Sequence, residues 1–153
     1  MAVVGNVAQR RLVEADMQRL AVGARVFFLG ALESVLLAFQ AANCLAHPTL
    51  EDTFAMVVLE AMACGLPVVV SGRRYCGIAH LLVSDRDALL LQNPLDVGEL
   101  ASKLSQALFD AQVRATLQAA ALKFASEHLW SVKAQELQII YDEVVASARE
   151  VNP

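Results

Sequence analysis

Short apolar runs alternate along this chain with segments of helical spacing, and this alternation limits its fold more than any other feature. The apolar runs fall at residues 2–4, 25–29, 43–47, 66–70 and 88–91. Helical spacing is found at 7–22, 33–42, 53–64, a short segment ending at Leu82, the segment that Asp96 opens, and about 110–127 and 131–150. Strands that alternate with helices form βαβ units with parallel strands. We therefore expect an α/β fold, a doubly wound parallel sheet of the Rossmann type with additional C-terminal helices.

Glycine and aspartate positions give the expected ends of several helices. Gly23 and Gly65 follow apolar helical segments, where a glycine ends a helix well because it accepts a left-handed backbone. Asp96 precedes a helical segment and Glu99 stands three residues later, which is the spacing of a capping box.

Composition agrees with a parallel sheet that is covered on both faces. Of the 153 residues, 57% are hydrophobic and 18% are charged, and the length suits one domain. The net charge of −4 argues against a nucleic-acid partner, which would require a basic surface. The three cysteines, Cys44, Cys64 and Cys76, lack metal-ligand spacing, and we expect reduced thiols in a cytoplasmic protein.

The segment 47–70 carries the strongest indication of chemistry. Glu60 is the only charged residue within 53–64, and a lone carboxylate in an apolar helix is costly unless it has a partner or faces a site. Asp52 stands eight positions earlier, at the expected start of the helix. One interpretation is structural, in which Asp52 caps the helix and Glu60 pairs with an arginine.

A second interpretation is a ligand site at the start of the same helix. A helix N-terminus offers free N–H groups and the positive end of the helix dipole, which suit a phosphate. The rise from Ala55 to Glu60 is ~7.5 Å, the scale of a diphosphate. One helix would then hold a sugar near Asp52, a diphosphate at its start and a ribose near Glu60.

The same segment resembles the E-x7-E region of the family 4 retaining glycosyltransferases, which have the two-domain GT-B fold. The matching residues are Pro48, Asp52, Thr53-Phe54-Ala55-Met56, Glu60-Ala61-Met62-Ala63, Gly65 and Pro67-Val68-Val69, and the flanking pieces Val3-Val4-Gly5, 26–30, Gly77, Trp130-Ser131 and Tyr141 agree. The resemblance covers nearly the whole chain. It implies a single nucleotide-sugar-binding domain over 1–153, the C-terminal half of such an enzyme.

The resemblance also implies which residues act. It gives catalytic roles to Asp52 and His80. The residues implied in donor binding are Glu60, Thr53, Phe54, Ala55, Met56, Val57, Gly5, Gly30, Ala31 and Leu32. It implies retaining hexosyl transfer from a nucleotide sugar without a cofactor and without a metal.

A finer resemblance rests on Tyr75-Cys76-Gly77-Ile78-Ala79-His80 together with His47-Pro48. These residues are similar to those of the lipopolysaccharide core glucosyltransferase I group. His80 stands at the position where most members of the wider family carry a glutamate. This resemblance implies UDP-glucose as donor, a glycan or glycolipid acceptor and a parent enzyme in the cytoplasm, peripheral on the inner membrane.

Several residues depart from the family pattern. Asp52 is one methylene shorter than the usual glutamate, and Thr53 and Ala55 replace glycines, so a β-carbon narrows the approach of a phosphate. The family's N-terminal acceptor domain, and an arginine and a lysine that bind the diphosphate, are not in this sequence. We therefore expect the isolated chain to bind donor weakly and to be inactive.

Other interpretations stay open. A non-catalytic nucleotide-binding or scaffolding module of the same fold would explain Asp52, Thr53 and Ala55. A dinucleotide oxidoreductase is disfavoured because Gly5 does not open a G-x-G-x-x-G motif. For His47, a structural role is favoured over a place lining the site. For Arg73 and Arg74, ordinary exposure to solvent is favoured over binding of an anion.

Overall fold

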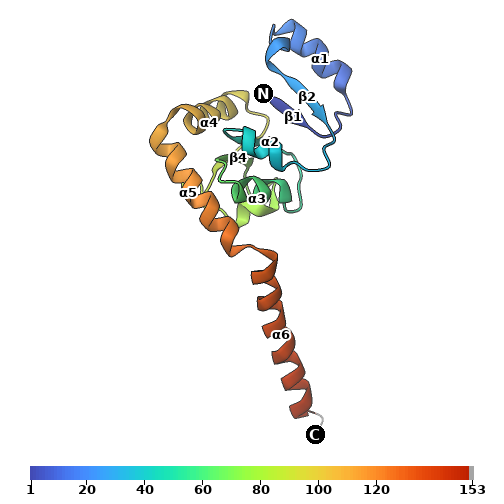
Figure 1. The fold of residues 1–153 in the computed structure, drawn as a ribbon, viewed down its shortest axis with the longest axis vertical. Helices are drawn as coiled ribbons and strands as arrows, with labels where there is room; N and C mark the ends of the chain where they lie inside the picture. The colour runs from blue at the N-terminus through green and yellow to red at the C-terminus, as the bar shows by residue number, and fades with distance from the viewer. Residues whose placement is uncertain (152–153) are drawn as a thin grey trace. The chain divides into compact units, whose positions relative to one another are not determined.

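The computed structural model describes residues 1–151, which form two compact units, residues 1–40 and the chain from Ala41 onward. The single domain expected over 1–153 stays a prediction, and each unit is described by itself. Figure 1 shows the course of the chain through its helices and strands.

The first unit contains a two-stranded parallel sheet. Its elements are β1 (Ala2–Val4), α1 (Arg10–Arg19), the 3-10 helix η1 (Gly23–Arg25), β2 (Phe27–Gly30) and α2 (Leu36–Ala41), whose last residue belongs to the second unit. The register of β1 on β2 shifts between Val3 and Val4. Both strands end at glycines with positive φ, and the Gly5 amide donates to the Gly30 carbonyl at 2.7 Å.

The second unit contains a three-stranded parallel sheet in the order β3-β4-β5. Its strands are β3 (Leu45–His47), β4 (Val68–Ser71) and β5 (Leu89–Leu91), and its helices are α3 (Met56–Ala63), the 3-10 helix η2 (Gly77–His80), α4 (Val97–Phe109), α5 (Ala111–Glu127) and α6 (Trp130–Val151). Every residue of β4 and β5 is buried. The parallel strands and flanking helices confirm the expected α/β class.

Helices of the second unit cover its sheet. The helix α3 contacts β3, β4 and α5, and α4 contacts β4, β5 and α5. The core lies between these layers and contains Val69, Leu89, Leu91, Ala107 and Leu117. The buried face of α3 carries Val58, Ala61 and Met62. The carboxyl ends of the three strands are left to the loops that build the candidate site.

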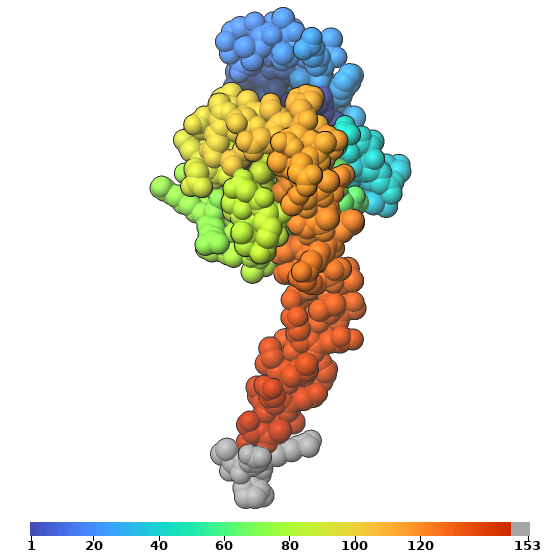
Figure 2. Space-filling model, turned by 90° about the vertical axis from the view of Figure 1, so that its left-hand side faces the viewer, coloured from blue at the N-terminus to red at the C-terminus, as the bar shows by residue number. Residues whose placement is uncertain are grey.

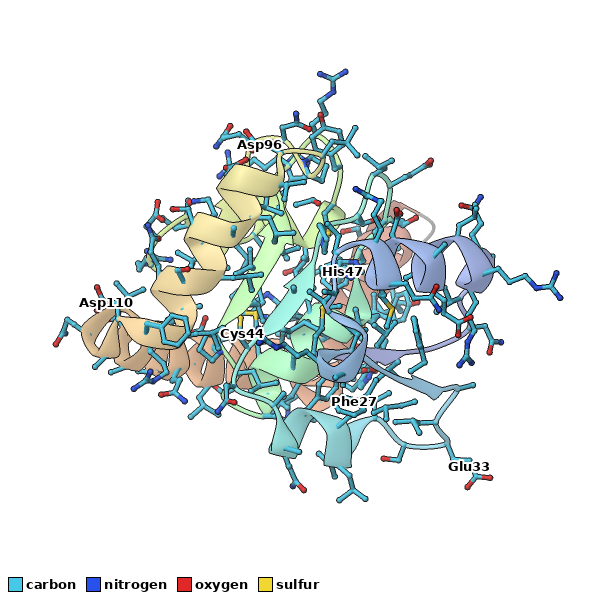
Figure 3. All side chains as sticks on the ribbon, turned by 90° about the horizontal axis from the view of Figure 1, so that it is seen from above. Phe27, Glu33, Cys44, His47, Asp96 and Asp110 are labelled. Carbon is cyan, nitrogen blue, oxygen red and sulfur yellow. The ribbon has the colours of Figure 1, made fainter. Side chains whose placement is uncertain are left out.

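Aspartate caps fix the starts of α4 and α5, where Figure 3 labels them. The Asp96 carboxylate accepts from the Glu99 amide at 2.9 Å, as expected, and Asp110 accepts from the amides of Gln112 and Val113. The Glu99 carboxylate does not complete a capping box with Asp96. It accepts instead from the amides of Gln92 and Asn93, and so ties the end of β5 to α4.

The helix α6 runs on from the end of α5 and extends away from the sheet of the second unit (Figures 1 and 2). It carries apolar side chains that are exposed, among them Trp130, which is 81% exposed, and Ile139, Ile140, Tyr141 and Val144. None of the helices within residues 1–151 has the length and apolar composition that crossing a lipid bilayer requires.

Candidate functional site

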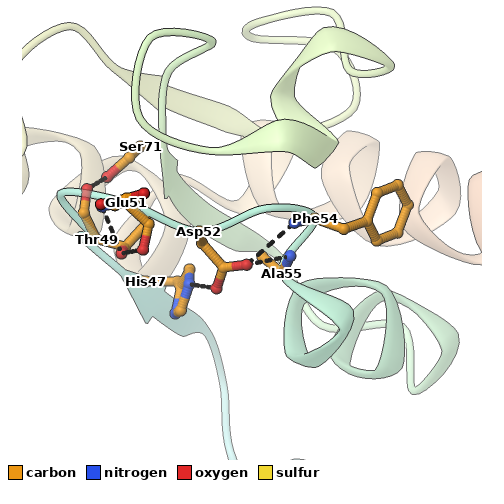
Figure 4. A network of polar contacts seen from close by, with 7 residues as sticks. All are labelled: His47, Thr49, Glu51, Asp52, Phe54, Ala55 and Ser71. Carbon is orange, nitrogen blue, oxygen red and sulfur yellow. Dashed lines mark hydrogen bonds and ion pairs between the residues drawn. The ribbon is translucent and has the colours of Figure 1, made fainter.

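Asp52 organises the loop between β3 and α3 (Figure 4). One of its carboxylate oxygens, Oδ1, accepts from the amide of Ala55 at 2.6 Å and from that of Phe54 at 3.1 Å. The other, Oδ2, lies 3.1 Å from Nε2 of His47, the last residue of β3. Both side chains are partly exposed, so the pair remains accessible from solvent.

These contacts set the charge of Asp52. Desolvation by burial acts to raise the pKa of the Asp52 carboxyl, but the hydrogen bonds with His47 and with the amides of Ala55 and Phe54 act the other way. Together they hold this pKa below its ordinary value. Asp52 is therefore ionised at neutral pH and presents a fixed negative charge beside the start of α3.

The backbone at Ala55 determines where α3 begins. Ala55 has a left-handed conformation, with φ 65° and ψ 63°, and is buried. Since Asp52 takes the amides of Phe54 and Ala55, the helix expected over 53–64 begins only at Met56. Within residues 1–151, no hydrogen-bond partner is found for the amides of Met56 and Val57, so these two donors are available to a ligand.

The segment at Asp52 runs alongside the segment 75–78. The Asp52 amide donates to the Tyr75 carbonyl at 2.9 Å, and the Gly77 and Ile78 amides donate to the carbonyls of Asp52 and Phe54. A β-carbon at Gly77 would lie 1.8 Å from the Thr53 carbonyl oxygen. Only glycine allows this approach, which brings η2 against the entrance of α3.

A second set of contacts holds the loop before Asp52 to the end of β4. The Ser71 hydroxyl donates to the Thr49 carbonyl at 2.6 Å, and the Thr49 hydroxyl donates to the Glu51 carbonyl at 2.9 Å (Figure 4). The loop is thereby fixed over the carboxyl edge of the sheet, the edge where ligands bind in open α/β folds.

Some of the residues predicted for the site come together. Asp52, Phe54 and Ala55 are joined by hydrogen bonds, with Thr53 between them and Met56 and Val57 following directly. Gly5 and Gly30 are joined by their own hydrogen bond in the first unit, where Ala31 and Leu32 follow β2.

Glu60 is the lone carboxylate of the apolar helical segment, which was expected either to have a partner or to face a site. Glu60 is on the exposed side of α3, because the buried face of this short helix is formed by Val58, Ala61 and Met62. Its charge therefore needs no buried partner, and its donor-binding role stays a prediction. His80 is likewise exposed, as the last residue of η2, and its catalytic role also stays a prediction.

The sequence analysis did not predict the contact between His47 and the carboxylate of Asp52. This contact is compatible with the structural role expected for His47, and that expectation stays a prediction. The available signal was its place at the end of an expected strand, five residues before an aspartate. The contact could not be derived from spacing alone because it depends on the turn at 48–51. Figure 3 labels Cys44, which directly precedes β3, and His47, which is the last residue of β3.

Cys76 lies beside the site but is poorly suited to attack a substrate. Its side chain is buried, and burial, followed by the negative charge of Asp52, raises the pKa of its thiol. The thiol stays protonated at neutral pH, which disfavours a nucleophilic role.

Comparisons with known proteins identify the family of this chain. The sequence profile of the family described as glycosyl transferases group 1 matches residues 1–124. The chain is 35% identical over 115 residues to the D-inositol 3-phosphate glycosyltransferase of Stackebrandtia nassauensis, covering 75% of this chain and 25% of that protein. It is 29% identical over 139 residues to the lipopolysaccharide glucosyltransferase WaaG of Escherichia coli, covering 90% of this chain and 36% of WaaG.

Solved structures of such enzymes are also similar. HepE of Anabaena, solved in complex with UDP, gives a TM-score of 0.81 at 25% identity and covers 92% of this chain and 40% of HepE. The structure of WaaG gives a TM-score of 0.75 at 28% identity over 91% of this chain and 37% of WaaG. The chain thus spans well under half the length of these relatives. The family profile covers residues 1–124, and the chain belongs to the group 1 glycosyltransferase family.

Proposed function

We propose that this chain is the donor-binding part of a retaining glycosyltransferase that transfers a hexose from UDP-glucose to a lipopolysaccharide core or another glycan. The observation that carries the proposal is the similarity to HepE, whose structures contain UDP, UDP with glucose, or UDP-glucose. The 29% identity to WaaG over 90% of the chain supports the acceptor class.

The start of α3 supports a role in holding the diphosphate. The amides of Met56 and Val57 have no partner within the described residues, and they stand at the positive end of the α3 dipole. Donors fixed in this way stabilise the charge that develops on a departing diphosphate without reorganising. Glu60 lies one turn further along the helix and is exposed, which leaves its carboxylate free to accept from ribose hydroxyls.

Asp52 in this proposal acts mainly through position and charge. Both of its oxygens already contact protein groups, so a sugar hydroxyl would share an acceptor that His47 or the Phe54 and Ala55 amides also use. His47 would then fix the orientation of the carboxylate toward the sugar.

The same engagement of Asp52 favours a second candidate function. A non-catalytic nucleotide-binding or scaffolding module would keep the amides of α3 and would need Asp52 only to hold the loop. The two candidates differ in the step after donor binding, because only the transferase would cleave the bond between the sugar and UDP.

The exposed apolar residues of α6 support a partner domain in the active enzyme. Ile139 and Ile140 lie next to each other in the chain and are 59% and 53% exposed, and Val144 follows one turn later at 61%. We propose that the N-terminal acceptor domain of the parent protein covers part of this helix. The isolated chain would accordingly bind UDP at best in the millimolar range and transfer no sugar.

The test is a titration of the chain with UDP, UDP-glucose, GDP and ADP, followed by two-dimensional NMR of the backbone amides. We expect UDP to shift the amides of Met56 and Val57. The variant Glu60→Gln should weaken UDP binding about tenfold, the scale of a charged hydrogen bond. Glu143→Gln is the matched control, since Glu143 is exposed on α6 and should leave UDP binding unchanged. Unchanged UDP affinity in Glu60→Gln would refute the assignment of Glu60.

A further inference from the structure

The carboxylate of Asp52 keeps one position at which a ligand can donate a hydrogen bond. An ionised carboxylate accepts at about four positions, two on each oxygen. Oδ1 uses both of its positions for the amides of Phe54 and Ala55, and Oδ2 uses one for Nε2 of His47 (Figure 4). Within residues 1–151, the position that remains is therefore on Oδ2, the oxygen that His47 contacts.

The charge of Asp52 determines where the ring of His47 carries its proton. An ionised carboxylate only accepts hydrogen bonds, so the contact of 3.1 Å between Nε2 and Oδ2 requires a proton on Nε2. Two states of the ring meet this requirement. One is the neutral ring with its proton on Nε2, and the other is the cation, which carries a proton on both nitrogens.

The ring of His47 is able to change its charge without leaving Asp52. Its side chain is 24% exposed, and no hydrogen-bond partner is found for Nδ1 in the part of the chain that the structure describes. Histidine ordinarily changes its charge between about pH 5 and 8. Solvent can therefore protonate Nδ1 while Nε2 keeps its contact with the carboxylate.

The elements that surround this pair contribute few other titratable groups. The strand β4, which pairs with β3, has none, and the loop after β3, the helix α3 and the segment 75–80 supply the rest. These residues are Glu51, Glu60, Tyr75, Cys76 and His80. Among their residue types only histidine ordinarily titrates between about pH 5 and 8, and His80 is exposed at the end of η2.

The charge of His47 sets how well Oδ2 accepts a second hydrogen bond. A hydrogen bond between two ions is roughly twice as strong as one between neutral groups. The cationic ring therefore draws more of the negative charge of Oδ2 to itself and leaves a weaker acceptor. The neutral ring still orients the carboxylate, but it leaves Oδ2 the stronger acceptor for a hydroxyl that shares this oxygen.

We infer that Oδ2 of Asp52 accepts from a hydroxyl of the donor sugar, and that His47 is a positioning residue whose neutral form holds this oxygen for the sugar and whose cationic form weakens the contact. This inference rests on the proposed function, because Asp52 meets a sugar only if α3 holds a nucleotide sugar. It concerns the sugar and not the nucleotide, so glucose should add more to the affinity for UDP as the pH rises through the titration of His47.

The first measurement uses the chain without a ligand. NMR of the ring nitrogens at pH 8 should show His47 with its proton on Nε2. His47→Phe keeps a ring but removes the donor, and it should raise the pKa of Asp52, because His47 acts to lower it. The carboxyl carbon of Asp52 reports this change.

The second measurement compares UDP with UDP-glucose. The gain from glucose is the ratio of the two dissociation constants, measured from the amide shifts of Met56 and Val57. His47→Gln keeps an N–H donor but does not titrate. Between pH 8 and pH 5.5, the gain should fall at least about threefold further in the unaltered chain than in His47→Gln. The terminal phosphate of UDP itself titrates near pH ~6, and this effect is common to both proteins.

Two further variants complete the comparison. His47→Phe should lose at least about threefold of the gain at pH 8, while its affinity for UDP at this pH stays that of the unaltered chain. His128→Gln is the matched control, because His128 ends α5 and its ring contacts the Phe124 carbonyl instead of the site. It should follow the unaltered chain at both pH values.

Four results would overturn the inference. The first is a neutral His47 with its proton on Nδ1, which could not donate from Nε2 to Asp52. The second is a pH dependence that is equal in His47→Gln and the unaltered chain, or that disappears in His80→Gln. The third is His47→Phe with the full gain from glucose. The fourth is a UDP complex at Met56 and Val57 to which glucose adds no affinity, since the diphosphate site would then stand without the sugar contact. UDP that leaves these two amides unshifted counts against the proposed function itself, so the two failures are distinguishable.

Discussion

The two parallel sheets of this chain differ in how far their strands are buried. Every residue of β4 and β5 in the second unit is buried. In the first unit, β1 and β2 alternate between half-buried and exposed residues, with Phe27 60% and Leu29 44% exposed. Parallel strands are normally covered on both faces, so the second unit has the ordinary environment of such strands and the first does not.

The tightly packed residues and those of the candidate site at Asp52 both lie in the second unit. The second unit contains the core and the entrance of α3, and its loops pack so tightly that Gly77 has no room for a side chain. In the first unit, the ends of β1 and β2 are joined by Gly5 and Gly30, around which a β-carbon would meet no atom within 4 Å. Matched substitutions in the two units should therefore have very different costs.

The largest effect is expected at Gly77. In Gly77→Ala the new β-carbon would lie 1.8 Å from the Thr53 carbonyl oxygen, so two backbone segments must move apart. We expect a loss of about 4 kcal/mol in the free energy of unfolding. Gly23→Ala in the first unit meets no atom within 4 Å and should change it by less than about 0.5 kcal/mol. Urea denaturation followed by circular dichroism measures both, and equal costs would contradict the packing at 75–78.

Leucines in equivalent strands give the next comparison. Leu89 in β5 is fully buried in the core, and Leu89→Ala should cost about 3 kcal/mol through lost burial and the cavity left behind. Leu29 in β2 is 44% exposed, and Leu29→Ala should cost less than about 1 kcal/mol. Differential scanning calorimetry of both variants is the measurement. A cost at Leu29 that matches Leu89 would mean that β2 is covered more fully than its exposure indicates.

A smaller effect is expected at Asp87, which is buried in the second unit. The hydrogen bonds from Arg86 lower the pKa of Asp87, the Val83 amide adds to this, and burial opposes it. A carboxyl with a lowered pKa in the folded state stabilises the fold above its unfolded pKa of about 4, and this contribution is lost as the pH falls through the folded value. Asp87→Asn should cost about 1.5 kcal/mol at pH 7 and almost nothing at pH 2.

The control for Asp87 lies in the first unit. Asp16 forms an exposed ion pair with Arg19 on α1, and its side chain is 65% exposed. Asp16→Asn should change the free energy of unfolding by less than about 0.5 kcal/mol at either pH. Guanidinium titrations across the range from pH 2 to pH 7 compare the two. A cost for Asp87→Asn that does not depend on pH would exclude the carboxylate as its origin.

Much of the fold could be predicted because the relevant signals are local. Asp96 caps α4 through the amide three residues on, and Gly65 ends α3 with a positive φ of 72°, both as expected from neighbouring residues alone. The contact of Glu99 differs from the expected capping box with Asp96. Its carboxylate reaches back to the end of β5, and this contact depends on how the strand and the helix pack together.

The candidate site was predicted less well, for a physical reason. The start of α3 and the orientation of Asp52 depend on contacts with His47 and with the Tyr75 and Gly77 backbone, which lie on separate segments of the sequence. Glu60 has apolar neighbours in the sequence, but apolar composition does not say which side of a helix of eight residues faces the core. The sequence identified the segment, and the packing determined the face.

The smallest predicted effect concerns Ala55, where the family pattern and the local backbone both favour glycine but this chain has alanine. Ala55 is buried with φ 65°, a conformation in which a β-carbon costs about 1–2 kcal/mol and glycine costs nothing. Glycine also gains freedom in the unfolded chain, which offsets part of this. Ala55→Gly should therefore stabilise the second unit by about 0.5–1 kcal/mol. Ala63→Gly, on the exposed side of the same helix, should instead destabilise it by about 1 kcal/mol. Thermal denaturation of the two variants should shift in opposite directions.

Because removing the β-carbon also opens the approach to the amides of Met56 and Val57, Ala55→Gly should bind UDP at least as tightly as the unaltered chain. Weaker UDP binding in a stabilised variant would place the diphosphate elsewhere than at the start of α3.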